Sequence, residues 1–413
     1  MKISVFNLGC KVNRYEADRL LGLITQRGHE AVDGLAFADV YIINTCAVTN
    51  EAEKKSRQAV ARALKFNPNA RVLVCGCASQ NNAEQFSKIK GVTFIKGVAS
   101  KDEILDHIDE IGSNVEKLPL VYDEGGASCE MRTRGAIKIS DGCNNFCSYC
   151  LIPYLRGRVR SRNADEIKAE FDLLSKSHAE IVLTGIDMSS YGKDTGTNIV
   201  ELLASLKNDK ARIRLGSLEL SVVTRELLEV MKSHKCFCDH FHLSLQSGSR
   251  DVLKAMNRHY TPEEYLSAVK LIREYFPDAA ITTDIIAGFP TETEGHHEET
   301  KSFAKEVGFA DIHVFEYSKR DGTVAAKMKQ VAPDVKQRRT AELIAVKEEL
   351  RKQYLSRFVG KTAEVVFEED GGYTSNYVKV YADVNAEDFS GKLVKVRLLE
   401  PYKDGMKGVL ITE

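Results

Sequence analysis

The sequence of 413 residues has no apolar run that approaches the roughly 18 residues needed for a membrane-spanning helix. Its first stretch, MKISVFNLGCKVNRYEADR, soon turns polar and lacks the apolar core of a secretory signal. These absences predict a cytoplasmic protein with no membrane partner. Thiols in that compartment stay reduced, so disulfide bonds are not expected.

The chain also lacks an excess of either charge, since 58 basic and 59 acidic residues give a formal net charge of −1. This balance excludes a protein that coats nucleic acid through an overall positive charge, but it does not exclude a local basic patch. Hydrophobic residues make up 43% and charged residues 28%, as in ordinary globular proteins. A chain of this size can bury a large hydrophobic core, so it does not need disulfide bonds to stabilise its fold. Its ten cysteines therefore need another explanation.

Alternating strand and helix patterns predict an α/β protein of several parts. Residues 1–112 combine strand patterns (2–8, 40–44, 71–75) with helical ones (14–27, 51–64), which predicts a parallel α/β domain. Residues 113–133 lack apolar periodicity and are expected to form a linker. From 134 to 356, six strand patterns alternate with helices, which fits an open barrel or a doubly wound sheet. Those strands are expected at 136–140, 180–185, 212–218, 240–246, 280–288 and 312–318, and one charged helix at 334–356.

The last part of the chain, residues 357–413, changes to short β patterns separated by turn residues. This predicts a small all-β module of about five strands, with the form of an OB-like barrel. The module holds eight basic and ten acidic residues, so its composition alone does not indicate an RNA-binding unit.

Three cysteines lie close together in DGCNNFCSYC, where Cys143, Cys147 and Cys150 form a CxxxCxxC pattern directly after a predicted strand. Three thiolates on one tight loop can hold three irons of a four-iron cluster and leave the fourth iron open. The alternative is a structural zinc site, which usually takes four ligands from two CxxC pairs. The sequence contains no second pair with that spacing, so a three-ligand cluster is favoured.

Three further cysteines, Cys10, Cys46 and Cys77, each follow a predicted strand. Since parallel strands end at one edge of a sheet, these thiols can converge on a second three-thiolate site. For any one of them alone, packing in the core is the simpler interpretation. Cys75 is expected to point to the opposite face from Cys77. No role is predicted for Cys129, Cys236 or Cys238.

These patterns resemble the radical S-adenosylmethionine (SAM) superfamily, and within it the methylthiotransferases. Their motifs G-C-x-x-N, N-T-C and G-C-x-x-Q match Gly9–Cys10–Asn13, Asn44–Thr45–Cys46 and Gly76–Cys77–Gln80. The resemblance implies a central partial (βα)6 barrel, a C-terminal TRAM domain and two 4Fe-4S clusters. It makes all six cysteines catalytic metal ligands, with SAM bound at the cluster of Cys143, Cys147 and Cys150.

The resemblance also implies SAM contacts at the ends of the central strands. The expected residues are Tyr149, Gly185, Asp187, Ser217, Glu219, Gln246, Gly288 and Phe289. Physically, Gly288 permits close backbone approach, and the ring of Phe289 can pack against a ligand. Asp187 stands where relatives often carry another polar residue, and Leu220 replaces the family's proline.

RNA contacts are expected from three places. Arg156, Arg158 and Arg160 alternate beside the cluster loop, and residues 319–361, which include Arg320, hold twelve basic and five acidic residues. In the C-terminal module, Tyr373, Asn376 and Tyr377 offer aromatic and amide groups to RNA. A solvated helix face is the alternative for residues 319–361, and a core or turn role is the alternative for the tyrosines.

The family transfers a methylthio group to an unactivated carbon, with one SAM methylating a cluster-associated sulfur and a second SAM providing the radical. Cys-Lys-Val-Asn at 10–13 and Gly-Tyr-Thr-x-Asn-Tyr at 372–377 resemble the MtaB-type branch. That branch methylthiolates carbon 2 of threonylcarbamoyladenosine in the tRNA anticodon stem-loop. It implies a reducing donor such as a flavodoxin or ferredoxin, and a monomer is favoured. The alternatives are isopentenyladenosine tRNA, a ribosomal-protein aspartate, or a noncatalytic iron–sulfur or zinc RNA-binding protein.

Overall fold

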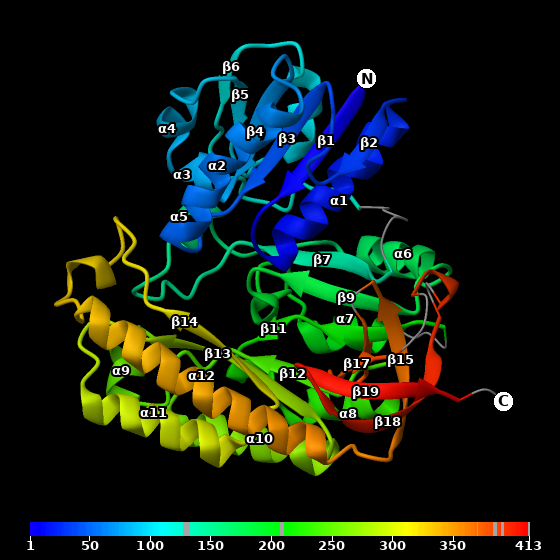
Figure 1. The fold of residues 1–413 in the computed structure, drawn as a ribbon, viewed down its shortest axis with the longest axis vertical. Coiled ribbons are helices and arrows are strands. Elements are labelled where there is room, and N and C mark those ends of the chain that lie inside the picture. Colours follow the sequence, from blue (N-terminus) through cyan, green and yellow to red (C-terminus); the bar gives the residue numbers. More distant parts are fainter. Residues whose placement is uncertain (127–132, 207–209, 370, 383–385, 390–391, 412–413) are drawn as a thin grey trace.

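The computed structural model describes residues 1–413 except 127–132, 207–209, 370, 383–385, 390–391 and 412–413. Cys129 therefore lies outside the described residues. Figure 1 shows three parts: an N-terminal α/β domain at the top, a central barrel below it, and a small β barrel beside the central part. The mixed α/β fold class predicted from the sequence is confirmed.

The N-terminal domain is built on a parallel six-stranded sheet in the order β2-β1-β3-β4-β5-β6. Its strands are β1 (Lys2–Asn7), β2 (Glu30–Asp33), β3 (Val40–Thr45), β4 (Arg71–Gly76), β5 (Val92–Lys96) and β6 (Gly112–Asn114). Its helices are α1 (Lys11–Gln26), α2 (Asn50–Phe66), α3 (Cys77–Asn81), α4 (Ala83–Ser87) and the 3₁₀ helix η1 (Lys101–His107). Strand β3 is buried along its whole length because it lies inside the sheet with helices on both faces.

The central domain is a partial barrel of parallel strands that keep their sequence order. They are β7 (Gly135–Asp141), β9 (Glu180–Gly185), β10 (Arg212–Leu215), β11 (Ser217–Leu218), β12 (His240–Leu243), β13 (Ala280–Ala287) and β14 (Asp311–Glu316). The expected strand at 212–218 is split at Gly216, and hydrogen bonds between Ile213 and residues Cys236 and Cys238 join the two halves of the barrel. This order selects the open barrel over the doubly wound sheet.

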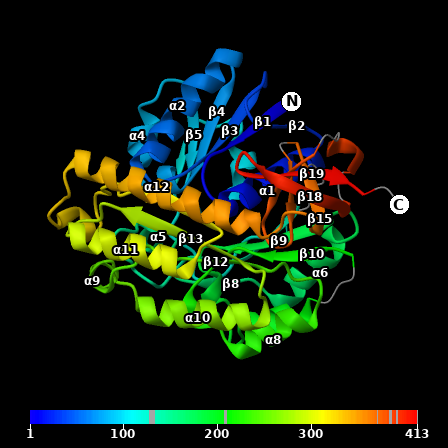
Figure 2. The same ribbon diagram turned by 60° about the horizontal axis from the view of Figure 1, so that its bottom comes forward.

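Helices cover the outer face of the partial barrel, as Figure 2 shows for α10, α11 and α12. The helices are α5 (Ile152–Leu155), α6 (Ala164–Leu174), α7 (Ile199–Ser205), α8 (Arg225–Ser233), α9 (Arg250–Ala255), α10 (Pro262–Tyr275), α11 (Glu294–Val307) and α12 (Pro333–Ser356). Thr261 forms a capping box with Glu264, and Pro262 stands at the first helical position, which fixes the start of α10. Among the described residues, no helix combines the length and apolarity needed to cross a bilayer.

The C-terminal part is a closed barrel in the order β15-β16-β17-β19-β18, which supports the OB-like prediction. The strands are β15 (Thr362–Glu368), β16 (Gly371–Thr374), β17 (Lys379–Tyr381), β18 (Val394–Tyr402) and β19 (Gly405–Leu410). Alternate residues such as Val365, Phe367 and Val396 fill its core, together with Tyr354 and Phe358 at the end of α12. The barrel is thereby packed onto the central domain rather than tethered loosely to it.

The segment after residue 112 is packed against both large domains in its described part. Strand β6 extends to Asn114, beyond the expected domain boundary. Val115 and Leu118 pack against the N-terminal core, and the carboxylate of Glu124 is buried beside β7. The segment therefore helps to fix the two domains relative to each other.

Candidate functional site

The three N-terminal cysteines lie at the ends of neighbouring strands. Cys10 precedes α1 after β1, Cys46 follows β3, and Cys77 opens α3 after β4. Burial raises the pKa of the Cys46 thiol to about 11, and the nearby thiols of Cys77 and Cys10 raise it further. The fold thus brings together the three thiols that the sequence assigns to one site.

Two glycines make this convergence possible. A Cβ atom on Gly9 would lie 3.0 Å from Cys46 Sγ, and one on Gly76 would lie 2.6 Å from the Thr45 carbonyl oxygen. Both residues have positive φ angles, of 120° and 106°. A side chain at either position would push the cysteine-bearing loops apart.

The other residues of the three motifs hold these loops in place. Asn13 Nδ2 donates to the carbonyls of Leu8 at 3.0 Å and Thr45 at 2.9 Å. Thr45 Oγ1 donates to the Cys75 carbonyl at 2.7 Å, and Gln80 Oε1 accepts from Val98 N at 3.0 Å. These side chains therefore position the backbone around the cysteines.

Cys75 lies apart from this site, in the core between the sheet and α1, whereas Cys77 adjoins the core beneath α2. The expected separation is found, but strand alternation is not its cause, because alternation places residues two apart on the same face. The strand β4 ends at Gly76, whose φ of 106° turns the chain into α3 and carries Cys77 away from the face of Cys75. Burial raises the pKa of the Cys75 thiol to about 12, and its place in that core separates it from the other three thiols.

The second set of cysteines occupies the loop between β7 and α5. Backbone N–H groups of Asn145 and Ile152 donate to the sulfurs of Cys143 and Cys150 at 3.5 and 3.4 Å. Arg258 Nη1 donates to Cys147 Sγ at 3.3 Å. Donors of this kind stabilise thiolates and tune iron–sulfur clusters.

The donor chemistry of both cysteine sets fits an iron–sulfur cluster. All six thiols are free. Donors reach all three sulfurs of the central set and the sulfur of Cys77 in the N-terminal set. Thiolates that accept such hydrogen bonds are the ligands of iron–sulfur clusters.

The two cysteine sets lie near each other at the domain interface. Leu151 and Leu155, which follow the central cysteine loop, share a buried cluster with Cys77, and Arg156 Nε donates to Cys77 Sγ at 3.2 Å. Burial raises the pKa of the Cys150 thiol to about 12. Two redox groups at these positions would share one space, which is what a reaction that uses both requires.

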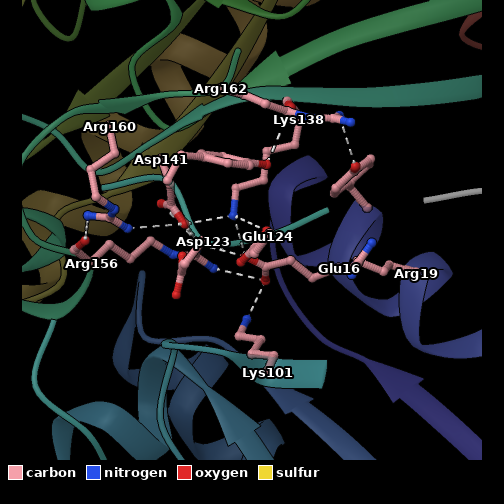
Figure 3. A network of polar contacts seen from close by, with 12 residues as sticks. Glu16, Arg19, Lys101, Asp123, Glu124, Lys138, Asp141, Arg156, Arg160 and Arg162 are labelled. Atoms are coloured by element: carbon pink, nitrogen blue, oxygen red, sulfur yellow. Dashed lines mark hydrogen bonds and ion pairs between the residues drawn. The ribbon is translucent and has the colours of Figure 1, made fainter. Parts of the chain in front are cut away.

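A buried charge network joins the two domains beside these cysteines (Figure 3). Arg156, which is 0% exposed, donates from Nε to Cys77 Sγ at 3.2 Å and from Nη1 to Glu16 at 2.7 Å and Asp141 at 3.0 Å. Lys138 donates to Glu16, Glu124 and Asp141 at 2.7–3.0 Å. Although burial opposes its charge, Asp141 has a lowered pKa because Arg156 and Lys138 surround it.

Glu16, Lys138 and Asp141 were not singled out by the sequence patterns. A signal was present, since Lys138 is a lone charge within the apolar strand AIKIS, and such a charge needs a buried partner. Its partner in α1 is visible only in the folded chain, because Glu16 comes from a different domain.

A cavity of about 610 Å³ opens beside the central cysteine loop, and Asn145, Asp187, Glu219 and Arg258 line it. Arg258 binds both Glu219 and Cys147 Sγ, so it connects the cavity to the cluster loop. Asp187 accepts a hydrogen bond from Ser190 Oγ at 2.7 Å. The cavity thus contains two of the expected SAM contacts.

The other expected SAM contacts lie around this region in different settings. Ser217 is exposed, and Gly185 packs close to Ser140 on the adjacent strand. The ring of Tyr149 meets the fully buried Phe289 edge to face at 6.4 Å. Gly288 lies beneath the side chain of Lys336 in α12. Gln246 has a φ of 69°, and this turn is why β12 ends before the predicted strand end.

The expected RNA contacts require correction. Arg156 and Arg160 are buried, and Arg160 donates to the backbone oxygens of Arg156 and Arg158. Arg320 is also buried, where it pairs with Glu53 and donates to Asn50 Oδ1 at 2.6 Å. These arginines join parts of the protein, because an Nη atom of each guanidinium donates to an acceptor within the protein. Arg158 alone of the four is exposed.

The expected basic patch at 319–361 is largely balanced by acids from other elements. Arg338 pairs with Glu294, Arg339 with Glu292, and Lys347 with Asp311. The patch is thus mainly a set of ion pairs that hold α12 to the barrel, since its partners come from α11, β14 and the loop before α11.

Tyr373 and Tyr377 lie at the junction of the C-terminal barrel with the central domain. Tyr377 stacks on His240 at 4.1 Å with ring planes 2° apart, and on Tyr373 at 5.0 Å. Asn376 accepts from Tyr354 at its carbonyl oxygen at 2.9 Å. The alternative of a core or turn role accounts for these contacts better than a free RNA-binding surface.

Comparison with known proteins agrees with this architecture. The model described as the Radical SAM superfamily matches residues 137–304, and that described as Uncharacterized protein family UPF0004 matches residues 2–97. A solved structure of the radical S-adenosylmethionine methyltransferase TsrM from Kitasatospora setae has a TM-score of 0.55. It shares 12% identity and covers 76% of this chain and 74% of that chain, which supports the fold alone.

Curated relatives match almost the whole chain. The threonylcarbamoyladenosine tRNA methylthiotransferase MtaB of Bacillus subtilis is 39% identical over 98% of this chain and 95% of its own. MtaB of Aquifex aeolicus is 38% identical over 96% and 100%. The tRNA-2-methylthio-N(6)-dimethylallyladenosine synthase of Thermodesulfovibrio yellowstonii is 34% identical over 99% of both chains. Fold, cysteine arrangement and near-full-length identity together show that this chain belongs to the radical SAM methylthiotransferases that modify tRNA.

Proposed function

We propose that this enzyme methylthiolates carbon 2 of threonylcarbamoyladenosine next to the tRNA anticodon, using SAM and two 4Fe-4S clusters. The observation that carries the proposal is the pair of three-cysteine sets near each other at the domain interface, in a chain that is 39% and 38% identical to two relatives named for this nucleoside. Cys143, Cys147 and Cys150 would hold one cluster, and Cys10, Cys46 and Cys77 the other.

The bound clusters and SAM supply the radical and sulfur-transfer chemistry, and the protein supplies position and shelter. Arg258 fixes Cys147 and Glu219 relative to each other at the cavity beside the cluster loop. Arg156 fixes Cys77 relative to Glu16 and Asp141 at the domain interface. The Arg156 contacts cross the domain interface, so they help to hold the two cysteine sets at a fixed separation.

The rim of the central cluster loop offers a place for the anticodon loop. The guanidinium of Arg158 lies 4.4 Å from the ring centroid of Phe146, and the exposed Tyr154 meets the same ring edge to face at 5.6 Å. Unstacked RNA bases pack on such aromatic and guanidinium planes, while the arginine charge attracts phosphate. A flavodoxin or ferredoxin would serve as reductant.

Anaerobic reconstitution followed by nucleoside analysis tests the proposal. The holoenzyme should contain about eight irons per chain, as expected for two four-iron clusters. With reductant and SAM, it should convert threonylcarbamoyladenosine in tRNA to its methylthio form, detected by mass spectrometry of digested nucleosides. Zinc in place of iron, with no SAM cleavage, would instead support a noncatalytic RNA-binding protein and overturn the proposal.

The second candidate substrate is tRNA that carries dimethylallyladenosine. It is favoured by the 34% identity to the synthase of Thermodesulfovibrio yellowstonii over nearly the full length. The two substrates are separated by offering the same tRNA with either modification to one enzyme preparation. Product from the dimethylallyl form alone would replace the proposed substrate with the second candidate.

A further inference from the structure

Three neighbouring strands of the central barrel carry two histidines and an aspartate on one face. His242 lies on β12, Asp284 on β13 and His313 on β14, and Figure 1 shows these strands side by side. In the register of the sheet, Asp284 is directly opposite His313. His242 is opposite Thr282, which lies on β13 two residues before Asp284. Because residues two apart on a strand point to the same face, the register brings the three side chains together.

This face of the strands is the inside of the barrel. Ile285 and Ile312, the neighbours of Asp284 and His313 along their strands, are fully buried in the core under the outer helices. Alternation therefore directs the polar side chains to the opposite, inner side. The exposed fraction of the side chain rises from 8% at His242 to 27% at Asp284 and 48% at His313. The group is thus held by protein on one side and open to solvent on the other.

The nitrogen and oxygen atoms of this group have the spacing of metal ligands. His313 Nδ1 is 3.1 Å and His242 Nε2 is 3.5 Å from an oxygen of the Asp284 carboxylate. One ligand atom from each of the three residues lies within 4.8 Å of the other two. Bonds of about 2.0–2.1 Å to nitrogen and oxygen place neighbouring ligands of a tetrahedral zinc ion about 3.3 Å apart. The two distances to the carboxylate lie on either side of that value.

The ring of His242 is held in place by the hydroxyl of Thr282. His242 Nδ1 lies 3.0 Å from Thr282 Oγ1, and the same oxygen lies 2.9 Å from His240 Nε2. A metal-binding histidine almost always forms such a hydrogen bond through its second ring nitrogen, because the bond orients the ring toward the ion. In this group, the bond to Thr282 leaves His242 Nε2 on the side of Asp284.

Two imidazoles and one carboxylate form a donor set with a preference among metals. Imidazole suits zinc, iron, copper and nickel, whereas magnesium and calcium prefer sites made of oxygen atoms. Three protein ligands with an open side are typical of zinc sites that keep one position for water or another oxygen ligand. The two cysteine sets offer thiolates instead, so the chain has two chemically different kinds of metal-binding group.

The group also lies apart from the strand ends at which SAM contacts are expected. Gln246 follows the end of β12, and Gly288 follows the end of β13. His242 and Asp284 lie earlier, within those strands. An ion held by them would therefore occupy the barrel interior, separately from the residues expected to contact SAM.

We propose that His242, Asp284 and His313 bind one divalent transition-metal ion such as Zn²⁺ and leave a coordination position open toward the barrel interior for an oxygen ligand. The ion is additional to the two 4Fe-4S clusters, and its site does not depend on which modified adenosine is the substrate. Thr282 is a positioning residue, because it acts on the ion only through His242.

The test measures zinc in the holoenzyme, because the free thiols of the apoprotein would bind zinc themselves. Holoenzyme with both clusters is equilibrated anaerobically with Zn²⁺ and separated from unbound metal by gel filtration, and its iron and zinc are counted by mass spectrometry. Wild type should retain about one zinc per chain in addition to about eight irons. Isothermal titration calorimetry of the same holoenzyme gives the dissociation constant for zinc.

Variants of the group separate ligands from the positioning residue. His313→Gln and Asp284→Asn each remove one ligand, so the affinity for zinc should fall by more than about 100-fold. Thr282→Val keeps all three ligands but removes the hydroxyl that orients His242, so a loss of about 10- to 100-fold is expected. If Asp284→Asn loses iron, which would indicate a disturbed fold, the exposed His313→Gln decides the outcome.

The matched control is His107→Gln, which removes a histidine that pairs with Glu110 in the N-terminal domain and should leave zinc binding unchanged. Three results would overturn the inference. The first is a wild-type holoenzyme that retains no zinc, and the second is equal zinc in wild type and His313→Gln. The third is a gain of zinc matched by a loss of iron, which would place the zinc at the cysteines. None of these results bears on the proposed function, which nucleoside analysis tests separately.

Discussion

The two cysteine sets are held in different ways. Cys143, Cys147 and Cys150 lie on one loop, and backbone N–H groups of that loop reach two of their sulfurs. Cys10, Cys46 and Cys77 come from the ends of three strands, and the sulfur of Cys77 accepts from Arg156 of the other domain. The central set is therefore determined locally, whereas the N-terminal set depends on sheet register, on glycines and on the domain interface.

The largest effect is expected from loss of a ligand in the central set, because both SAM cleavage and methylthiolation require the cluster that this set would hold. Cys147→Ala removes one of three ligands of the central cluster, so SAM cleavage and methylthiolation should both disappear, and iron content should fall by about half. Anaerobic iron analysis and SAM-cleavage assays measure this. Retained SAM cleavage in this variant would contradict the assignment of the central set.

Replacement of Cys77 should separate the two sets. Cys77→Ala should abolish methylthiolation but leave SAM cleavage measurable, because the central set needs no ligand from the N-terminal domain. Cys75→Ala is the matched control, since its thiol lies in the core on the α1 side of the sheet. Loss of product in Cys75→Ala with full product in Cys77→Ala would reverse the ligand assignment.

Arg156 is the point at which the N-terminal set relies on the central domain. Arg156→Met leaves Glu16 and Asp141 buried without a full set of partners, which should cost about 3–5 kcal/mol in the free energy of unfolding. The potential of the N-terminal cluster should become more negative, because a donor to Cys77 Sγ is lost. Urea unfolding of the apoprotein and redox titration of the holoprotein measure the two effects.

Arg156→Lys is the matched variant, because it keeps the charge but not the forked geometry. It should fall between wild type and Arg156→Met in both measurements. If Arg156→Met has the wild-type free energy of unfolding and its N-terminal cluster keeps the wild-type potential, then Arg156 does not stabilise the N-terminal set across the domain interface.

Glycine substitution tests the dependence on strand ends. Gly76→Ala places a Cβ atom 2.6 Å from the Thr45 carbonyl at a φ of 106°, so it should cost about 3 kcal/mol and lower iron at the N-terminal site. Gly28→Ala has a φ of 76° and open space around it, so about 1 kcal/mol is expected. Thermal unfolding of the apoproteins compares the two, and equal costs would show that the close approach is unimportant.

The same contrast explains what the sequence could predict. The CxxxCxxC loop is visible in the sequence because its geometry is local, and alternating patterns were sufficient to place β7, β9 and β13 within a residue or two. The short β2, β5 and β6 were missed, because strands of three to five residues carry little periodicity.

Residue roles that depend on tertiary contacts were harder to predict. Arg156 and Arg320 were expected to meet RNA because they lie in basic stretches, yet both are buried against acids from distant parts of the chain. Charge counts along a sequence cannot distinguish a solvent-facing arginine from one that joins two domains.

The smallest effect is expected from a substitution at the junction of the C-terminal barrel with the central domain. This substitution tests whether weakening a different interface also disturbs the N-terminal cysteine set. Tyr377→Leu removes the stacking on His240 and the Arg214 contact, whose guanidinium lies 5.3 Å from the ring centroid, so about 1 kcal/mol should be lost. Iron content and the signals of both clusters should remain those of wild type, because the cysteines lie elsewhere. The tRNA dissociation constant of Tyr377→Leu should change little. Arg158→Gln, by contrast, should weaken tRNA binding and lower the salt dependence of that binding. A cluster signal altered in Tyr377→Leu would mean that interface dependence extends through the whole protein rather than through Arg156.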